Sequence, residues 1–399
     1  MIAGKKRFIL IATSFSDPGT MGGNTKIAIE TVRQLSERMP VIVIIPTERL
    51  STLTDNISAN ERITIYTTES YKRNARLHPF EEAFFYFKQL RRLFVELNIS
   101  ASDLVFTSSD WLYDALPLFL LKGKFQFTWI TSNFLFVPTP FENLIKRYKF
   151  PFFLYILAYI YQRSIFQLIK WRGDLFVITN DCDRKYFPTR CHNRIFAFYG
   201  GVNIDQIEAV EKEPATIKYD IIFCSRLHQQ KGMDQFLDIW KLIVKECPKA
   251  KLAIIGNGTP QYEQYLHRKA EQLGINNNIE WLGYVNNEEK FRLYRASRFF
   301  VHSTVYDNNG MVAAEALCTG LWTIMNDLPN LRDIYSDGCT KSDFSDTIAT
   351  AKVIVELLGS PQSHTLSNII TKKYRHHWDW AHRVHLFEDF LNRSGQQQS

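Results

Sequence analysis

The stretch Phe300–Gly320, FVHSTVYDNNGMVAAEALCTG, joins an apolar strand to a helix of small residues through a polar turn. This order of segments predicts one βα unit of a parallel sheet. Two carboxylates, Asp307 and Glu315, flank the turn eight positions apart. Because small apolar residues are typical of a buried helix, a glutamate in its second turn indicates a function rather than a solvated surface.

The same alternation of apolar strands and amphipathic helices runs along most of the chain and predicts an α/β fold with two parallel sheets. The charged stretch 205–220, DQIEAVEKEPATIKYD, follows the turn YGGVN and separates two series of strands. We therefore expect an N-terminal Rossmann-like domain over 1–204 and a C-terminal one over 216–374. The aromatic-rich helix over 375–392 is expected to cross back to the first domain. The expected strands are 8–13, 41–45, 63–66, 103–106, 125–130, 175–179, 220–224, 251–256, 279–282, 298–302 and 322–325, and the expected helices are 24–38, 232–246, 260–273, 287–296 and 311–319.

Composition is that of an ordinary folded protein with two domains, since 399 residues exceed one typical core and 45% of them are hydrophobic. The N-terminus reads as a first strand rather than a secretory signal, and no run of eighteen apolar residues predicts a membrane-spanning helix. Six cysteines without C-x-x-C spacing favour reduced thiols in the cytoplasm and no zinc site.

Positive charge is concentrated in the first half, where residues 1–200 hold 26 basic against 17 acidic residues; the remainder holds 22 against 24. The segment 141–172 contributes six basic residues against one acid, among dense aromatic side chains. Two interpretations stay open: a surface lying on an anionic membrane through a patch with Lys146, Arg147 and Lys149, or a pair of buried helices under the first sheet. Nucleic-acid binding is disfavoured because no recognised module is present.

Three features of the second half predict one anion site. Arg226 ends a strand and Lys231 follows after a short loop, so both can approach the same diphosphate at the carboxyl edge of the sheet. Gly256 and Gly258 follow the next strand and would permit close backbone approach by a ligand. Gly310 precedes a helix whose first N–H groups favour an anion. Glu315, deeper in that helix, could accept hydrogen bonds from the hydroxyls of a ribose.

These residues carry a resemblance to a known family. From Ser225 onward, SRLHQQKG, LAIIGNG, IEWLGYVNNEE and the opening stretch are similar to the retaining nucleotide-sugar glycosyltransferases of family 4. The resemblance covers 220–335 strongly and extends weakly to YGGVN, to GTMGGN and to the C-terminal WDWA. It implies the GT-B fold, two Rossmann-like domains with a donor and acceptor cleft between them, and transfer of a hexose from a nucleotide diphosphate to a saccharide or lipid-linked saccharide.

The resemblance also implies roles for single residues. Arg226 and Lys231 would hold the donor diphosphate, together with the helix start at Asn309, Gly310, Met311 and Val312. Glu315 would bind the ribose, and Asp307 would face the donor sugar where the family more often has a glutamate. Gly22 and Gly23 would form a second anion cradle in the first domain. The family often has a histidine after the strand FQFTWIT, a position at which Ser132 or Asn133 would have to supply any polar contact.

Alternatives to this interpretation remain. Asp181-x-Asp183 resembles a metal-binding pair of the other glycosyltransferase fold, but a polar turn is the simpler explanation, and we expect no metal or other cofactor. The expected role is that of a cytoplasmic enzyme in cell-surface glycan, polysaccharide or glycolipid synthesis, with peripheral attachment to the inner face of the membrane as an open interpretation. The second hypothesis is a non-catalytic subunit that binds a nucleotide-sugar or glycan and supports a partner. A phosphorylase or epimerase with the same twin-domain fold is a third.

Overall fold

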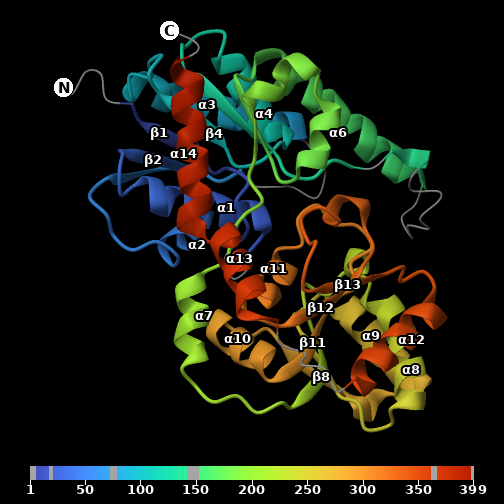
Figure 1. The fold of residues 1–399 in the computed structure, drawn as a ribbon. Coiled ribbons are helices and arrows are strands. Elements are labelled where there is room, and N and C mark those ends of the chain that lie inside the picture. Colours follow the sequence, from blue (N-terminus) through green and yellow to red (C-terminus); the bar gives the residue numbers. More distant parts are fainter. Residues whose placement is uncertain are drawn as a thin grey trace. The chain divides into compact units, whose positions relative to one another are not determined.

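Each predicted series of strands forms one parallel sheet in the computed structural model, which describes residues 6–17, 21–71, 79–137, 139–141, 152–360 and 366–396. The chain divides into two units (Figure 1). Unit 1 comprises Met1–Gly200 with Trp380–Ser399, and unit 2 comprises Gly201–Asp379. The α/β fold class and the two Rossmann-like sheets predicted from the sequence are thereby confirmed.

Unit 1 contains a seven-stranded parallel sheet in the order β3-β2-β1-β4-β5-β6-β7. The order reverses its direction at β1, so the carboxyl ends of β1 and β4 flank the switch point at which such sheets bind ligands. The strands are β1 Phe8–Ile11, β2 Val41–Pro46, β3 Ile63–Thr68, β4 Leu104–Thr107, β5 Thr128–Asn133, β6 Leu175–Ile178 and β7 Ile195–Ala197. The described helices are α1 Gly23–Leu35, α2 Leu50–Thr54, α3 Pro79–Glu96, α4 Leu112–Leu121, α6 Phe152–Arg172 and α14 Trp380–Gln396.

The core of unit 1 forms because its strands are apolar on both faces, as parallel strands covered by helices on both sides must be. Every residue of β1, β2, β4 and β6 is buried. On one face, Trp129 and Phe176 of the sheet join Phe94 of α3 and Phe166 of α6 in a single apolar cluster. On β7, Phe196 packs against Phe387 of α14, with ring centroids 5.3 Å apart. The C-terminal helix thus completes the first unit.

Unit 2 contains a six-stranded parallel sheet in the order β10-β9-β8-β11-β12-β13. Its strands are β8 Tyr219–Cys224, β9 Leu252–Ile255, β10 Ile279–Gly283, β11 Ser297–His302, β12 Trp322–Asn326 and β13 Cys339–Ser342. Its helices are α7 Ile204–Glu211, α8 Met233–Glu246, α9 Pro260–Leu273, α10 Asn287–Arg295, α11 Met311–Cys318, α12 Thr347–Gly359 and α13 Asn368–Trp378. The carboxyl ends of the central strands β8 and β11 therefore lie side by side, with register Val301 opposite Phe223.

Two segments differ from the sequence prediction. The charged stretch 205–220 is not a linker at its start, because α7 buries Ile207 and Val210 against unit 2 and exposes its charges. The C-terminal helix is two helices, since Asp379 is extended (φ −60°, ψ 130°) and pairs with Val202 as an isolated bridge. The backbone N–H of Val202 donates to the Trp378 carbonyl at 2.6 Å. This break ends α13 within unit 2 and starts α14 within unit 1.

One described helix, α6, meets the length and composition expected of a membrane span, with a mean hydropathy of 1.3 over its most apolar window. The sequence predicts no such helix from an uninterrupted apolar run, because Gln162 and Arg163 interrupt this one. Of the predicted pair of buried helices under the first sheet, only α6 lies in the described residues. Much of its first half is exposed, whereas its second half contains the buried residues Ile165, Phe166 and Ile169 as well as the exposed Trp171.

Candidate functional site

Two loops at the carboxyl edge of the unit 2 sheet are bonded to each other and position the candidate donor site. The loop after β8 accepts hydrogen bonds at the carbonyls of Gln230 and Lys231 from Val305 N–H (2.9 Å) and Ser303 Oγ (2.8 Å). Gly232 permits this approach because its φ is +70° and a Cβ there would lie 2.1 Å from the Ser303 carbonyl oxygen. Lys231 is consequently held beside the loop that contains Asp307.

Lys231 and Asp307, both predicted as catalytic residues, form an ion pair with Nζ and Oδ2 2.8 Å apart. The other oxygen, Oδ1, accepts from the backbone N–H groups of Asn308 (2.8 Å), Asn309 (3.2 Å) and Gly310 (3.2 Å). Burial opposes ionisation of Asp307, but the Lys231 ammonium and a hydrogen bond from His302 outweigh it and hold its pKa well below its usual range. The anionic carboxylate of Asp307 is therefore bound in a cradle that consists of one ammonium group and three backbone N–H donors.

Helix α11 begins at the end of this cradle. Gly310 adopts the left-handed conformation (φ +65°), and the first N–H that bonds within the helix is that of Ala313, to the Gly310 carbonyl at 2.8 Å. The N–H groups of Met311 and Val312 precede that bond, and both residues are only half-buried. Tyr335 fixes the helix start, because its hydroxyl lies 2.8 Å from the Asn309 carbonyl and 2.9 Å from that of Gly310. The predicted anion-binding helix start is therefore rigidly placed.

Glu315 is buried in the second turn of α11, where its side chain is 5% exposed. Its Oε2 accepts a hydrogen bond from Nζ of Lys290 on α10 at 2.7 Å, and Lys290 is itself buried. Burial of the ammonium lowers its pKa, but the nearby Glu315 charge more than offsets this, so the pKa of Lys290 is raised. Lys290 and Glu315 thus form a buried ion pair inside the unit.

The other predicted donor residues lie at the same edge with different surroundings. Arg226 is exposed. The pKa of His228 is lowered mainly by burial of its own ring, and the nearby positive charge of Arg226 lowers it further. Gly256 (φ +126°) and Gly258 were expected to leave room for a ligand. In the structure, backbone atoms fill that space. A Cβ at Gly256 would lie 1.9 Å from the Ser225 carbonyl oxygen, and a Cβ at Gly258 would lie 2.3 Å from the Leu227 carbonyl oxygen. Packing of two loops explains both glycines, and their contact with a donor stays a prediction.

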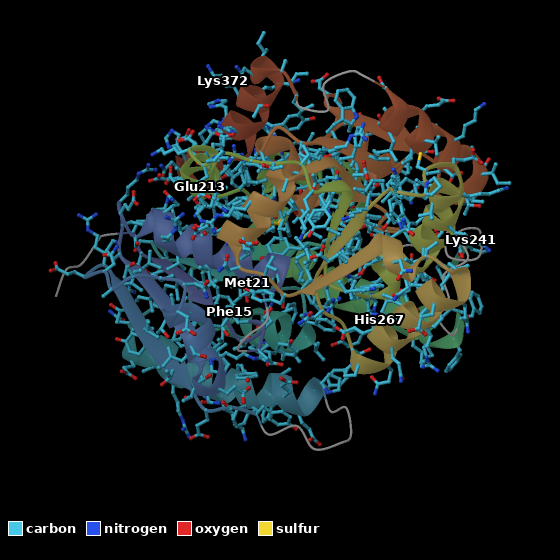
Figure 2. The ribbon with its side chains drawn as sticks, turned by 90° about the horizontal axis from the view of Figure 1, so that it is seen from below. Phe15, Met21, Glu213, Lys241, His267 and Lys372 are labelled. Atoms are coloured by element: carbon cyan, nitrogen blue, oxygen red, sulfur yellow. The ribbon has the colours of Figure 1, made fainter. Side chains whose placement is uncertain are left out.

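The predicted glycine cradle of unit 1 lies between β1 and α1, where Phe15 is buried and Met21 is exposed (Figure 2). Gly22 precedes the helix and Gly23 begins it. The N–H of Gly22 donates to Ser16 Oγ at 2.9 Å, so it closes the loop onto itself. A ligand role for this pair also remains a prediction.

The two predicted acceptor-side residues end β5 and differ in what they can offer. Ser132 is buried, and its hydroxyl donates to the Thr107 carbonyl of the neighbouring strand. Asn133 is also buried, but its Nδ2 makes no hydrogen bond of normal length to any described residue, although it lies close enough to Asp110 to lower the pKa of that acid. Asn133 is therefore the better candidate of the two.

Asp110 follows β4 at the same edge and was not predicted from the sequence. Its Oδ2 accepts from Gln162 Nε2 of α6 at 3.1 Å, and it is half-buried. Burial raises the pKa of Asp110 to about 6, against the opposing effects of hydrogen bonds from its own backbone, Gln162 and Asn133. A carboxyl group that titrates near neutrality at a sheet edge is typical of functional sites. The exposed Trp111 follows it directly and stacks on Tyr113.

The remaining predicted groups do not join these sites. Asp181 accepts from Arg184 Nε and from the Tyr199 hydroxyl, both at 2.6 Å, and Asp183 is buried. Across the described ranges, no three His, Cys, Asp or Glu side chains gather closely enough to bind a metal ion. The patch residues Lys146, Arg147 and Lys149 lie outside the described residues.

Comparison with known proteins finds similarity to glycosyltransferases. Residues 205–374 match the family model described as glycosyl transferases group 1. An uncharacterised glycosyltransferase of Methanocaldococcus jannaschii is 27% identical over 309 residues, which are 72% of this chain and 69% of the relative. The α-monoglucosyldiacylglycerol synthase of Streptococcus pneumoniae is 27% identical over 150 residues, covering 37% of this chain and 34% of the relative.

Solved structures show the same fold. Sucrose-phosphate synthase from Thermosynechococcus elongatus superimposes with a TM-score of 0.78 at 15% sequence identity, covering 99% of this chain and all of that one. Its likeness establishes the fold of this chain as GT-B. Taken together, the family match, the relatives and the fold support a glycosyltransferase with the GT-B fold.

Proposed function

We propose that this protein is a retaining, metal-independent hexosyltransferase that uses a nucleotide-diphosphate sugar and a saccharide or lipid-linked saccharide acceptor. We further propose that it acts on the cytoplasmic side in cell-surface glycan, polysaccharide or glycolipid synthesis. The observation that carries the proposal is the cradle at Lys231 together with the N–H groups of Met311 and Val312 that begin α11, with the buried Glu315 one turn into that helix.

The cradle suits a diphosphate leaving group. In the transfer step the bond between the anomeric carbon and the diphosphate breaks, and negative charge grows on the diphosphate. Lys231, the exposed Arg226 and the N–H groups of Met311 and Val312 would stabilise that charge. Asp307 already forms an ion pair with Lys231. Donor phosphates would therefore have to share the Lys231 ammonium with that carboxylate or displace the carboxylate from it.

The sugar and the nucleoside would use the two acids of the opening stretch. Glu315, paired with Lys290 through Oε2, would accept hydrogen bonds from ribose hydroxyls. Asp307 would contact the transferred sugar through Oδ2, while its Oδ1 remains on the loop. The oxygen of the acceptor hydroxyl would attack the anomeric carbon from the same face from which the diphosphate departs. The proton of that hydroxyl would pass to an oxygen of the departing diphosphate.

On the acceptor side, Asp110 and Asn133 would bind acceptor hydroxyls at the carboxyl edge of the unit 1 sheet. Asn133 supports this role because its buried amide lies beside Asp110 at the same sheet edge. Trp111, exposed beside Asp110, would offer a flat apolar face to a sugar ring.

A thermal-shift screen of UDP-, GDP- and ADP-sugars tests the donor class, since a ligand that binds only the folded state raises the melting temperature. Release of the nucleoside diphosphate in the presence of candidate acceptors then tests transfer. If no nucleotide-sugar at millimolar concentration raised the melting temperature above that of the protein alone, the proposal would be contradicted.

One observation favours the second candidate, a non-catalytic subunit that binds a nucleotide-sugar and supports a partner. Asp307 pairs with Lys231 and so reduces the charge available to a diphosphate. Slow hydrolysis of a bound donor by the purified protein would argue against this candidate, whereas donor binding without hydrolysis or transfer would favour it.

A further inference from the structure

Helix α6 is mostly exposed in its first half, apart from the buried Tyr155, and contributes core residues from its second half. In its first nine residues, Phe152, Phe153, Leu154, Leu157 and Ile160 are exposed, with 69% of Phe153 and 54% of Ile160 accessible. In its second half, Ile165, Phe166 and Ile169 belong to the core of unit 1. The exposed residues at 153, 157 and 160 fall on one stripe of the helix. An exposed apolar stripe of this kind marks an interaction surface.

Gln162 shows where the sheet edge meets this helix. Its Nε2 donates to Asp110 Oδ2 and to the Leu135 carbonyl (2.6 Å), while its Oε1 accepts from Val137 N–H (2.7 Å). All three partners follow the carboxyl ends of β4 and β5. The ten residues before Gln162 therefore continue about 15 Å past the carboxyl edge, at 1.5 Å per residue. In Figure 1 this half of α6 extends away from the strands of unit 1.

The positive charge of α6 indicates which kind of partner covers the exposed apolar stripe. Residues 152–172 contain Arg163, Lys170 and Arg172 and no acid. A second copy of this chain would bring like charges together, whereas an anionic lipid surface would be attracted to them. A full span is excluded by packing, since it would withdraw Ile165, Phe166 and Ile169 from the core.

We propose that the first three turns of α6 insert into the headgroup layer of an anionic membrane and place the carboxyl edge of the unit 1 sheet beside it. Asp110 and Asn133 lie at that edge, so the acceptor is a saccharide carried on a membrane lipid. The acceptor assignment rests on the proposed glycosyltransferase function; the membrane surface does not.

Vesicle flotation with the full chain tests the surface. Wild-type protein should float with vesicles containing phosphatidylglycerol at about 0.1 M salt, and less with pure phosphatidylcholine vesicles or at higher salt. The variant Phe153→Ser/Leu157→Ser should lose about a hundredfold in vesicle affinity, because two inserted apolar side chains are removed. The matched control Ile348→Ser/Ile369→Ser removes two exposed apolar side chains of unit 2 and should float as wild type does.

Several results would overturn the proposal. Absence of flotation with anionic vesicles, or equal loss in both double variants, would do so. A dimer that only Phe153→Ser/Leu157→Ser dissociates, without vesicle binding, would identify a second copy as the occupant. Melting temperatures and nucleotide-sugar thermal shifts of each variant report folding and donor binding separately. Flotation without any donor shift would retain the membrane surface and reject the transferase, while transfer to soluble saccharides alone would reject the lipid acceptor.

Discussion

Lys290 Nζ lies 2.7 Å from Oε2 of Glu315, and both side chains are buried within unit 2. Lys290 also donates to Asn287 Oδ1 at 3.1 Å, so two of its three donors are satisfied. A buried acid of this kind can remain charged and await a ligand only because a cation compensates it. The pair therefore connects the stability of the unit to its proposed ribose site.

Replacing Lys290 by methionine should lower the free energy of unfolding by about 3–5 kcal/mol, because it removes the cationic partner of a buried ion pair. The double variant Lys290→Met/Glu315→Gln should recover most of that loss while remaining unable to bind donor tightly. Urea unfolding and donor thermal shifts measure the two effects. Lys218→Met is the control, since the Lys218–Glu280 pair is exposed and should contribute less than about 1 kcal/mol. Equal losses for both lysines would contradict this account.

Lys231→Ala should reduce kcat by about 10²–10³-fold, the usual effect of removing one donor from a developing anion. Asp307→Asn should behave differently. The amide oxygen still accepts from the loop N–H groups, but Lys231 is released from its ion pair. We expect tighter binding of the nucleoside diphosphate together with slower transfer, measured by calorimetry and by steady-state kinetics. Weaker diphosphate binding by Asp307→Asn would show that the acid does not compete for Lys231.

Asp110→Asn should lower kcat/KM for the acceptor and leave the donor thermal shift unchanged, because Asp110 belongs to unit 1. The pKa of Asp110 is raised to about 6, so its carboxylate forms as the pH rises through that value. Acceptor kcat/KM in the wild type should rise across this window, and the rise should be absent in the variant. A pH profile identical in both proteins would remove Asp110 from the acceptor site.

Asp114 gives a pH dependence of stability rather than of activity. It is buried, accepts from Thr13 Oγ1 and Ser109 Oγ, and has a pKa raised to about 7, mainly by burial. Arg49 opposes the shift and the Asp110 charge adds to it. Because the folded pKa exceeds the unfolded one, the native state binds more protons between about pH 4 and pH 7, and stability falls as the pH rises through this window.

Three pKa units correspond to about 4 kcal/mol, so Asp114→Asn should gain in stability relative to wild type between pH 5 and pH 8. Melting temperatures at the two pH values measure this gain. Asp55→Asn, at an exposed position, should show the same pH dependence as wild type.

Transfer activity should persist in EDTA, since Lys231, Arg226 and the α11 start would supply the charge that a divalent cation supplies elsewhere. Loss of activity in EDTA with recovery on adding Mn²⁺ would overturn the metal-independent mechanism.

The sequence predicted the strands of both sheets because parallel strands buried on two faces are short apolar runs. It missed β7 and β13, which are three and four residues long, and β13 carries the sequence CTKS, which is hardly apolar. It also merged α13 with α14, because the break at Asp379 depends on pairing with Val202, a contact between residues far apart in the chain.

Within the site, the strand-end and helix-start residues could be predicted because their roles follow from position alone. Lys290 could not, although it shares a helix stripe with the buried Leu293 and Tyr294, a position where a lysine is unusual. The ion pair between Lys231 and Asp307 also escaped prediction, since it depends on how the loops after β8 and β11 are bonded together.

The break at Asp379 has a consequence for how the protein is made. Unit 2 is one continuous stretch, but unit 1 needs α14, which is synthesised after unit 2 and supplies Phe387 and Phe390 to the aromatic cluster on β7. During translation, unit 2 can complete its fold while the earlier-made unit still lacks α14. A ribosome stalled before residue 380 would therefore leave Phe196 and its apolar neighbours exposed, and chains truncated there should require chaperones or aggregate.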